Sequence, residues 1–356
     1  MKLDLIRAIR SQIQEGYSFT GTITPETERL AKLHDVTPFI YDLEQDRNKL
    51  LPIMARMIRL NHAAETMQAI LEEACIDHIP MKGAVIRALY PQMWMRTSCD
   101  VDILIHEEDL DRATKAFVAH GYQMRKRNYH DVSLFSPDGV HLELHFSIRE
   151  TIEAMDRVLD QVWNYAVPQE GCKYRYLESK EFFMFHHIAH MAYHFQGGGC
   201  GIRPFVDLWF MNKYYEIDEQ IYHNLLREAN LEIFEKHAKM LMHYWFDDGE
   251  ANELILNMER YIVYGGVYGS NKQSVIIKQQ KAGGKFNYFL KRIFMPYKTM
   301  VMIYPILKKH KWLLPVCEIH RWGKVFSAKD RILKETKTAI KVREDYSVDM
   351  MKELGL

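Results

Sequence analysis

Hydrophobic and polar residues alternate in two stretches of the first half of the chain. In residues 100–105, DVDILI, two aspartates alternate with apolar residues, and in residues 140–146, VHLELHF, two histidines and a glutamate do so. Side chains two apart in a β-strand share a face, so each stretch predicts a strand with one apolar and one polar face. The residues on the polar faces are Asp100 and Asp102 in the first strand, and His141, Glu143 and His145 in the second.

The neighbouring segments complete a small sheet. A short extended segment ends at Lys82-Gly83, a helical pattern covers residues 107–120 before Gly121, and residues 122–128 resume as a strand. The turn Ser-Pro-Asp-Gly at 136–139 joins two alternating runs and is a strong hairpin signal. The order strand, helix, strand, helix, strand, hairpin strand predicts a mixed sheet with helices packed on it.

Helical spacing dominates on both sides of this sheet. At the N-terminus, Thr24-Pro25 resembles a helix start, Pro52 is expected to open a longer helix, and a Met-rich stripe follows it. We predict an α+β (α/β) fold in which a small mixed sheet is flanked by a helical N-terminal segment and a mostly helical C-terminal region. The expected units are a helical brace behind the sheet (1–75), the sheet-containing core (76–150), a helical domain (151–270) and a basic, aromatic-rich helical tail (271–356).

The composition is that of an ordinary globular protein, with 47% hydrophobic and 26% charged residues. The five cysteines are scattered without a Cys-x-x-Cys pair, which argues against a disulfide framework or a zinc ribbon. The N-terminus lacks the apolar core of a signal peptide, and no apolar run is long enough to span a bilayer. These features predict a cytoplasmic protein without a transmembrane segment.

The formal net charge of zero hides a division along the chain. Residues 271–343 carry 18 basic and three acidic side chains, whereas residues 1–270 carry 28 basic and 40 acidic ones. Aromatic residues are interleaved with the basic ones in this tail: Phe286, Tyr288, Phe289, Phe294, Tyr297, Tyr304, Trp312, Trp322 and Phe326. Three interpretations stay open: contact with RNA, peripheral contact with an anionic membrane, and packing of the aromatic residues onto the acidic body.

The polar faces of the two strands suggest a metal site. Hard cations such as Mg²⁺ prefer oxygen ligands and often combine one or two carboxylates with substrate phosphates. Asp100 and Asp102 provide two carboxylates, and Glu143 is the candidate third. Upstream, Lys82-Gly83 places a cation and a bare backbone at a strand-to-helix junction, where phosphate oxygens can be bound. Solvated acidic residues on an edge strand are the alternative interpretation.

Three further features are open to two interpretations each. His186, His190 and His194 lie on one helical stripe with zinc-compatible spacing, but hydrogen-bonded interface histidines are the simpler interpretation. The glycine-rich residues 197–201 lack the ending of a P-loop and read as a mobile connection between helices, or as a loop that closes over a nucleotide. Arg203 and Asp207 are four apart on the next helix and are expected to pair with each other.

Several motifs together resemble a known family. Lys82-Gly83, the run Arg96-Thr97-Ser98-Cys99-Asp100-Val101-Asp102, and Glu143-Leu144-His145 resemble the bacterial nucleotidyltransferase family proteins of the polymerase-β-like superfamily. The similarity continues in residues 201–208 and 264–269 and covers most of the chain after about Ile76. The spaced Lys-Gly, Asp-x-Asp and Glu-x-His set is its most specific part.

This resemblance implies a function and a set of roles. Asp100, Asp102 and Glu143 are then the catalytic and metal-ligating residues, with Mg²⁺ or Mn²⁺ as cofactor, in the transfer of NMP from an NTP such as ATP to an acceptor hydroxyl. The nucleotide-binding residues implied are Lys82, Gly83, Arg96, Ser98 and His145. The acceptor is not identified by the sequence, and RNA or another phosphate-rich molecule is one expectation.

Two other classes of function remain open at this stage. The chain could be a nucleotide- or RNA-binding regulator that has lost turnover, or a membrane-surface scaffold that acts through its basic tail. Retention of Asp100, Asp102 and Glu143 together with Lys82 favours the enzyme, because a site without turnover has no physical need for all four.

Overall fold

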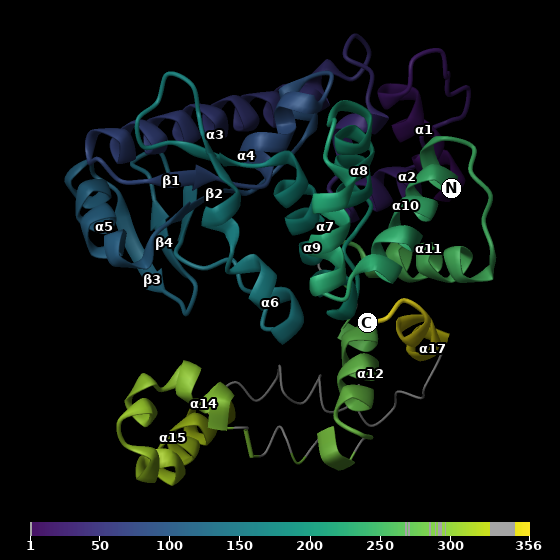
Figure 1. Ribbon diagram of the computed structural model, residues 1–356. Coiled ribbons are helices and arrows are strands. Elements are labelled where there is room, and N and C mark those ends of the chain that lie inside the picture. The colour runs from purple at the N-terminus through teal and green to yellow at the C-terminus, as the bar shows by residue number, and fades with distance from the viewer. Residues whose placement is uncertain are drawn as a thin grey trace.

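The computed structural model describes residues 2–267, 269, 271–284, 286–288, 290, 294–295, 297–327 and 346–356 (Figure 1). It has the predicted α+β architecture, with a mixed five-stranded sheet in the order β1-β2-β5-β4-β3. The strands are β1 (His78–Pro80), β2 (Asp100–Ile105), β3 (Gln123–Arg127), β4 (Asp131–Phe135) and β5 (His141–His145).

Strand β2 lies in the interior of this sheet. It pairs in parallel with β5 and antiparallel with β1, while β4 and β5 form the predicted hairpin. The hairpin turn is closed by hydrogen bonds from the Gly139 N–H to the Ser136 carbonyl and from the Val140 N–H to the Ser136 hydroxyl, both at 2.9 Å. Two strands that are distant in sequence are thereby placed side by side with their polar faces on the same side of the sheet.

Helices make up most of the remaining structure. The α-helices are α1 (Lys2–Ile13), α2 (Pro25–Leu33), α3 (Arg47–Glu73), α4 (Gly83–Ile86), α5 (Leu110–Ala119), α6 (Glu153–Leu159), α7 (Lys180–Gln196), α8 (Arg203–Tyr214), α9 (Glu219–Glu228), α10 (Glu232–Phe246), α11 (Glu253–Gly265), α12 (Asn271–Lys281), α14 (Tyr297–Ile303), α15 (Leu314–Ser327) and α17 (Tyr346–Glu353). Short 3₁₀ helices cover 37–40, 87–89, 93–95, 107–109, 162–165, 305–308 and 311–313.

Helices α3 and α5 cover the apolar face of the sheet. The Met-rich stripe of α3, including Met57 and Met67, packs with Val101 and Ile103 of β2 in one buried cluster. Packing is therefore the role of this stripe. The expected helix start at Pro52 is wrong, since α3 begins at Arg47. The helix tolerates the proline within its second turn.

The first two helices lie outside the buried cluster on the apolar face of the sheet. Residues of α1 and α2 instead join a second, larger buried cluster built mainly from helices α7 to α11. Within the N-terminal segment, α3 is the helix whose residues pack in the cluster on the apolar face of the sheet. The predicted domain boundaries near residues 75, 150 and 270 stay a prediction.

The segment after residue 151 contains a small sheet that the sequence pattern did not reveal. Strands β6 (Ala166–Pro168) and β7 (Tyr176–Glu178) pair antiparallel between α6 and α7. Three-residue strands are too short for a detectable alternation of apolar and polar residues. The rest of the described chain from residue 151 to 265 is mostly helical, as expected.

The glycine-rich segment at 197–201 packs against another glycine-rich segment. A Cβ atom on Gly265 would lie 2.7 Å from the Gly198 carbonyl oxygen, and one on Gly269 would lie 2.6 Å from the Gly198 carbonyl carbon. The two backbones thus touch directly, and there is no room for a side chain at Gly265 or Gly269. This contact is a packing role that neither sequence interpretation of the loop had included.

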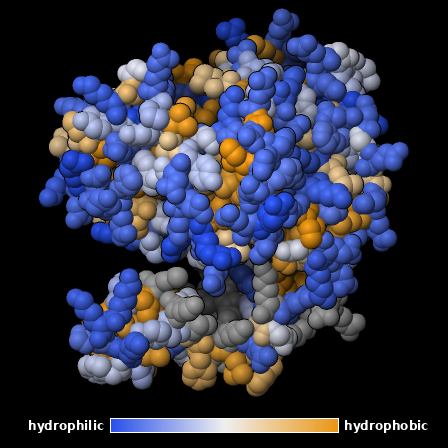
Figure 2. Space-filling view, in the orientation of Figure 1, coloured by the Kyte–Doolittle hydropathy of each residue, from blue (hydrophilic) through white to orange (hydrophobic). Residues whose placement is uncertain are grey.

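The tail forms separate small clusters. Met300, Leu307 and Cys317 are buried together, but Phe286, Phe294 and Trp312 are 74%, 69% and 74% exposed. Figure 2 shows hydrophobic residues at the surface of the lower part of the molecule, where α12, α14 and α15 lie in Figure 1. These three aromatic residues therefore do not pack onto the acidic body. Of the predicted tail, Phe289 and residues 328–345 lie outside the described residues, as does Tyr268 of the second glycine motif.

Within the described ranges, the helices are all too short or too polar to cross a lipid bilayer.

Candidate active site

The polar face of β2 and β5 carries five side chains able to bind a metal. In the parallel register, Asp100 is opposite His141 and Asp102 is opposite Glu143, while His145 pairs with Leu104. The reverse face of both strands is buried under α3 and α5. The amphipathic pattern of the two strands therefore fixes which side chains meet, and the three predicted carboxylates lie on the same face.

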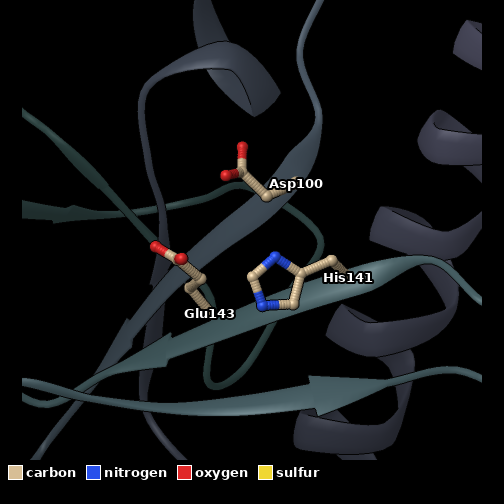
Figure 3. A group of neighbouring side chains, drawn as sticks. All are labelled: Asp100, His141 and Glu143. Atoms are coloured by element: carbon tan, nitrogen blue, oxygen red, sulfur yellow. The ribbon is translucent and has the colours of Figure 1, made fainter. Parts of the chain in front are cut away.

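These five side chains form two triads that share Glu143. The outer triad is Asp100, His141 and Glu143, and the inner triad is Asp102, Glu143 and His145. In each triad, one ligand atom from every residue lies within 4.8 Å of the others. The outer triad is partly exposed, and Figure 3 shows its imidazole beside the two carboxylates.

The inner triad already contains cationic partners. The Lys82 Nζ lies 3.0 Å from Asp102 Oδ1, and His145 Nε2 lies 2.9 Å from the same oxygen and 3.4 Å from Glu143 Oε2. Asp102 and His145 are both buried, so these contacts are weakly screened by water. Lys82 and His145, which were predicted to bind the nucleotide, thus neutralise Asp102 in this structure.

Electrostatics separates the two aspartates. Burial works to raise the pKa of Asp102, but Lys82 and His145 outweigh it and hold that pKa well below its usual range. The pKa of Asp100 is raised instead, first by burial and then by the charges of Asp102 and Glu143. Burial opposes protonation of His145, but its hydrogen bonds with Asp102 and Glu143 raise its pKa.

The Lys82-Gly83 turn lies against a floor of two guanidinium groups. Lys82 has a φ of +47°, and a Cβ atom on Gly83 would lie 3.0 Å from Arg96 Nη1 and 3.2 Å from Arg87 Nη2. A larger residue at position 83 would therefore require the turn or these guanidinium groups to shift by a few tenths of an ångström. Helix α4 after the turn is only four residues long, so the predicted phosphate cradle depends on Lys82 and the bare backbone more than on a helix dipole.

Arg96 is held below this turn by a buried ion pair. Its Nη2 and Nε lie 2.8 and 3.0 Å from the two oxygens of Asp207, which also accepts a hydrogen bond from the Tyr90 hydroxyl at 2.5 Å. The expected pairing of Arg203 with Asp207 is wrong, because Arg203 instead forms an ion pair with Asp35. Asp207 pairs with Arg96 and Arg203 pairs with Asp35, so each residue has a partner distant in the sequence in place of the i, i+4 contact.

Ser98 and Arg87 complete the floor. The Arg87 Nη2 donates a hydrogen bond to the Ser98 hydroxyl at 2.9 Å, and Arg87 also donates to Asn61 of α3. Burial first, and then the neighbouring Arg96, lower the pKa of Arg87 to about 10. A buried guanidinium next to another one is stable only if carboxylates or phosphates balance the charge nearby.

The histidine stripe of α7 is tied to carboxylates. His186 Nδ1 lies 3.0 Å from Glu178 Oε1, and His190 Nδ1 lies 2.6 Å from Glu150 Oε1. Among the residues that the structure describes, the groups of three or more potential metal ligands are the two triads, and none includes the stripe. The zinc interpretation of the stripe thus gains no support, and hydrogen-bonded histidines describe it.

Some residues of the site were not among those selected from the sequence. His141 shares the alternation of Glu143 and His145 and was recognisable by that pattern. Arg87, Glu150 and Asp207 carry no local signal, because each gains its place through a partner distant in the chain.

Comparison with known proteins adds one match. The model of a family described as "uncharacterised nucleotidyltransferase" matches residues 29–247, which is more than half of the chain. The matched region includes the whole five-stranded sheet, both triads and the Lys82-Gly83 turn. Neither the curated proteins nor the solved structures contain a match to this chain.

Proposed function

The chain belongs to the uncharacterised nucleotidyltransferase family, and on this premise we propose that it transfers NMP from an NTP to an acceptor hydroxyl with the aid of a divalent cation. The resemblance noted from the sequence is confirmed at the level of the family, and it supports nucleotidyl transfer as the general activity. The observation that carries the proposal is that Asp100, Asp102 and Glu143 share one face of two paired parallel strands.

The residues present suit a divalent cation. Carboxylate oxygens and imidazole nitrogens converge within 4.8 Å, and such donors bind Mg²⁺ or Mn²⁺. Asp100, Asp102 and Glu143 are the residues that would hold it. When bound, the cation supplies charge neutralisation at the triphosphate and lowers the pKa of a coordinated hydroxyl.

The protein's own groups then bind and orient the reactants. The Lys82 Nζ lies 3.0 Å from Asp102 Oδ1 and the Lys82 side chain is 30% exposed, so Lys82 can exchange Asp102 for a phosphate oxygen. The bare backbone at Gly83 lets a phosphate approach above the buried Arg87 and Arg96. Positioning and charge neutralisation provide most of the rate in such a transfer.

The reaction has a simple balance of bonds and protons. The acceptor oxygen forms a bond to the α-phosphorus, the bond from that phosphorus to the bridging oxygen breaks, and pyrophosphate leaves. Glu143 is 30% exposed and ionised, and it accepts the proton of the acceptor hydroxyl. The imidazole of His145, 3.4 Å from Glu143 Oε2, stabilises the Glu143 carboxylate when the ring is protonated.

Transfer from labelled nucleotides tests this proposal. The protein is incubated with each α-³²P-labelled NTP, Mg²⁺ or Mn²⁺, and RNA, protein and small-molecule fractions as acceptors. We expect label in one fraction together with released pyrophosphate, and neither with Asp100→Asn. Equal transfer by Asp100→Asn would reject the proposal.

The tail supports a second candidate role, which is peripheral contact with an anionic membrane. Besides Trp312, the aliphatic residues Ile303, Ile306, Val316 and Ile319 are 49% to 74% exposed, and Lys308, Lys309 and Lys311 lie among them. Aliphatic side chains insert between lipids but offer no plane for stacking a base, so this surface favours a membrane over RNA.

Vesicle flotation distinguishes these partners. We expect the full chain to float with vesicles containing phosphatidylserine, and not with neutral vesicles. The double variant Trp312→Ser, Ile319→Ser is expected to stay in the bottom fraction of the gradient, with its nucleotidyl transfer activity unchanged. Salt-dependent binding to RNA without flotation would contradict the membrane role.

A further inference from the structure

The two triads differ in how much of their charge is already balanced. Within the described part of the chain, no hydrogen bond or ion pair reaches the Asp100 carboxylate, and charged groups act on it only at longer range. In contrast, one oxygen of Asp102 faces both Lys82 and His145 at about hydrogen-bond distance. A cation entering the inner triad must therefore compete with an ammonium group, while one entering the outer triad does not.

We propose that the first divalent cation binds before any nucleotide to Asp100, His141 and Glu143, and that His141 makes this site prefer Mn²⁺ to Mg²⁺. The use of the cation rests on the proposed function, but the site itself does not. The proposal adds His141 to the three carboxylates as a metal ligand. It also identifies Mn²⁺ as the preferred cofactor.

The imidazole of His141 is held as a metal ligand must be. Its Nε2 lies 2.7 Å from the Ser133 hydroxyl of β4, and its ring stacks on Phe135 with centroids 4.8 Å apart. With the proton on Nε2 and donated to Ser133, the lone pair of Nδ1 is left for a ligand. Metal-binding histidines use their second nitrogen in this way, which fixes both the tautomer and the ring orientation.

The mixed donor set explains the expected selectivity. Mg²⁺ binds oxygen ligands and gains little from imidazole, whereas Mn²⁺ accepts nitrogen and oxygen more evenly. Two carboxylates and one imidazole from adjacent strands leave the other coordination positions to water and, later, to phosphate oxygens. The nucleotide then completes the site, because its phosphates draw Lys82 away from Asp102.

Electron paramagnetic resonance of Mn²⁺ tests the proposal without nucleotide or turnover. The free Mn²⁺ signal gives the affinity, and pulsed measurements detect the ¹⁴N nucleus of a coordinated imidazole. For the wild-type protein we expect one bound Mn²⁺ with a ¹⁴N coupling. For His141→Ala we expect the coupling to vanish and the affinity to fall by at least about tenfold, with a smaller change for Mg²⁺ measured by competition.

Matched variants identify the ligand. His145→Ala removes the imidazole of the inner triad and is expected to keep the coupling, while Ser133→Ala is expected to keep it with about tenfold weaker binding. If His141→Ala does not fold, His141→Gln carries the same expectation. A coupling that survives in His141→Ala, or bound Mn²⁺ without any ¹⁴N coupling in the wild type, would overturn the proposal.

The outcome is separate from that of the transfer assay. A protein that binds Mn²⁺ through His141 but transfers no nucleotide would contradict the proposed function and leave this site intact. Transfer with Mg²⁺ but no Mn²⁺–nitrogen coupling would do the reverse.

Discussion

The outer and inner triads are built from nearly the same ligands, yet their environments differ. Each has one aspartate of β2 and one histidine of β5, and both use Glu143. In the inner triad, Asp102 and His145 are buried and Lys82 contacts Asp102, whereas all three residues of the outer triad are partly exposed. The strands supply both triads, but one segment outside them, the Lys82-Gly83 turn, makes them unequal.

This difference shows how a strand pair can produce two sites with separate tasks. The charge of Asp102 is balanced by protein side chains, so this carboxylate keeps its position without a bound metal ion. The pKa of Asp100 is raised, first by burial and then by the charges of Asp102 and Glu143, so a bound cation would stabilise its ionised form. We expect the outer triad to recruit the cation and the inner triad to respond when the nucleotide binds.

The largest expected effect is on turnover, and it should be alike for both triads. Asp100→Asn and Asp102→Asn each remove one carboxylate charge without changing shape, and each should lower single-turnover transfer by about 10³-fold. Without nucleotide, however, only Asp100→Asn should weaken Mn²⁺ binding strongly. Equal Mn²⁺ affinities of the two variants would remove the distinction between the triads.

Removing the ammonium group should make the triads more alike. In Lys82→Met the inner triad loses its internal cation, so a second Mn²⁺ ion is expected to bind without nucleotide. The KM for NTP should rise about tenfold or more, since a charged hydrogen bond to phosphate is lost. Titration monitored by the free Mn²⁺ signal counts the ions, and a stoichiometry that stays at one would contradict the assignment of Lys82.

Gly83→Ala should affect the Lys82-Gly83 turn beside the inner triad and leave metal binding at the outer triad unchanged. Its Cβ atom would lie 3.0 Å from Arg96 Nη1, so the turn or the guanidinium group must shift. We expect a loss of about 1–2 kcal/mol in the free energy of unfolding and weaker NTP binding, with Mn²⁺ affinity within about twofold of the wild type. Urea denaturation and Mn²⁺ titration measure these separately. Gly323→Ala in α15 is a control, because φ is not positive at either glycine and no atom lies within 4 Å of the Cβ added at Gly323.

The smallest expected effect is a pH dependence of stability through His145. Its folded-state pKa is raised, so its stabilising contribution is complete below its unfolded pKa of about 6.5 and is lost as the pH rises through the folded-state value. Asp102 has a lowered pKa and stays ionised throughout this range. In EDTA, the unfolding free energy of the wild type should exceed that of His145→Asn by more at pH 6 than at pH 9. A difference that grows with pH would contradict the assignment.

Much of the sheet and of the polar face could be predicted from the sequence. The alternation in residues 100–105 and 140–146 is strong because one face is buried, and the Pro-Asp-Gly turn fixes the hairpin register. Both signals are local, so a single sequence contains them. The face shared by Asp100, Asp102 and Glu143 followed directly, although their roles remain proposals.

Contacts between distant segments could not be predicted in this way. Arg96 finds Asp207 over a separation of 111 residues, and nothing near either residue indicates the other. The sequence did not show that α1 and α2 join a different buried cluster from most of α3, because apolar spacing identifies the buried face of a helix but not its partner. Lys82 was expected to face phosphates, and its contact with Asp102 became visible only when β1 and β2 were paired in space.

The central claim is that the carboxylates of β2 and β5 hold a divalent cation beside the triphosphate. Anomalous diffraction at the manganese edge, from crystals grown with Mn²⁺ and a non-hydrolysable NTP analogue, tests it most directly. The account predicts a manganese peak in contact with Asp100 and Glu143 and with phosphate oxygens of the analogue. A triphosphate bound elsewhere, or manganese density away from both strands, would contradict it.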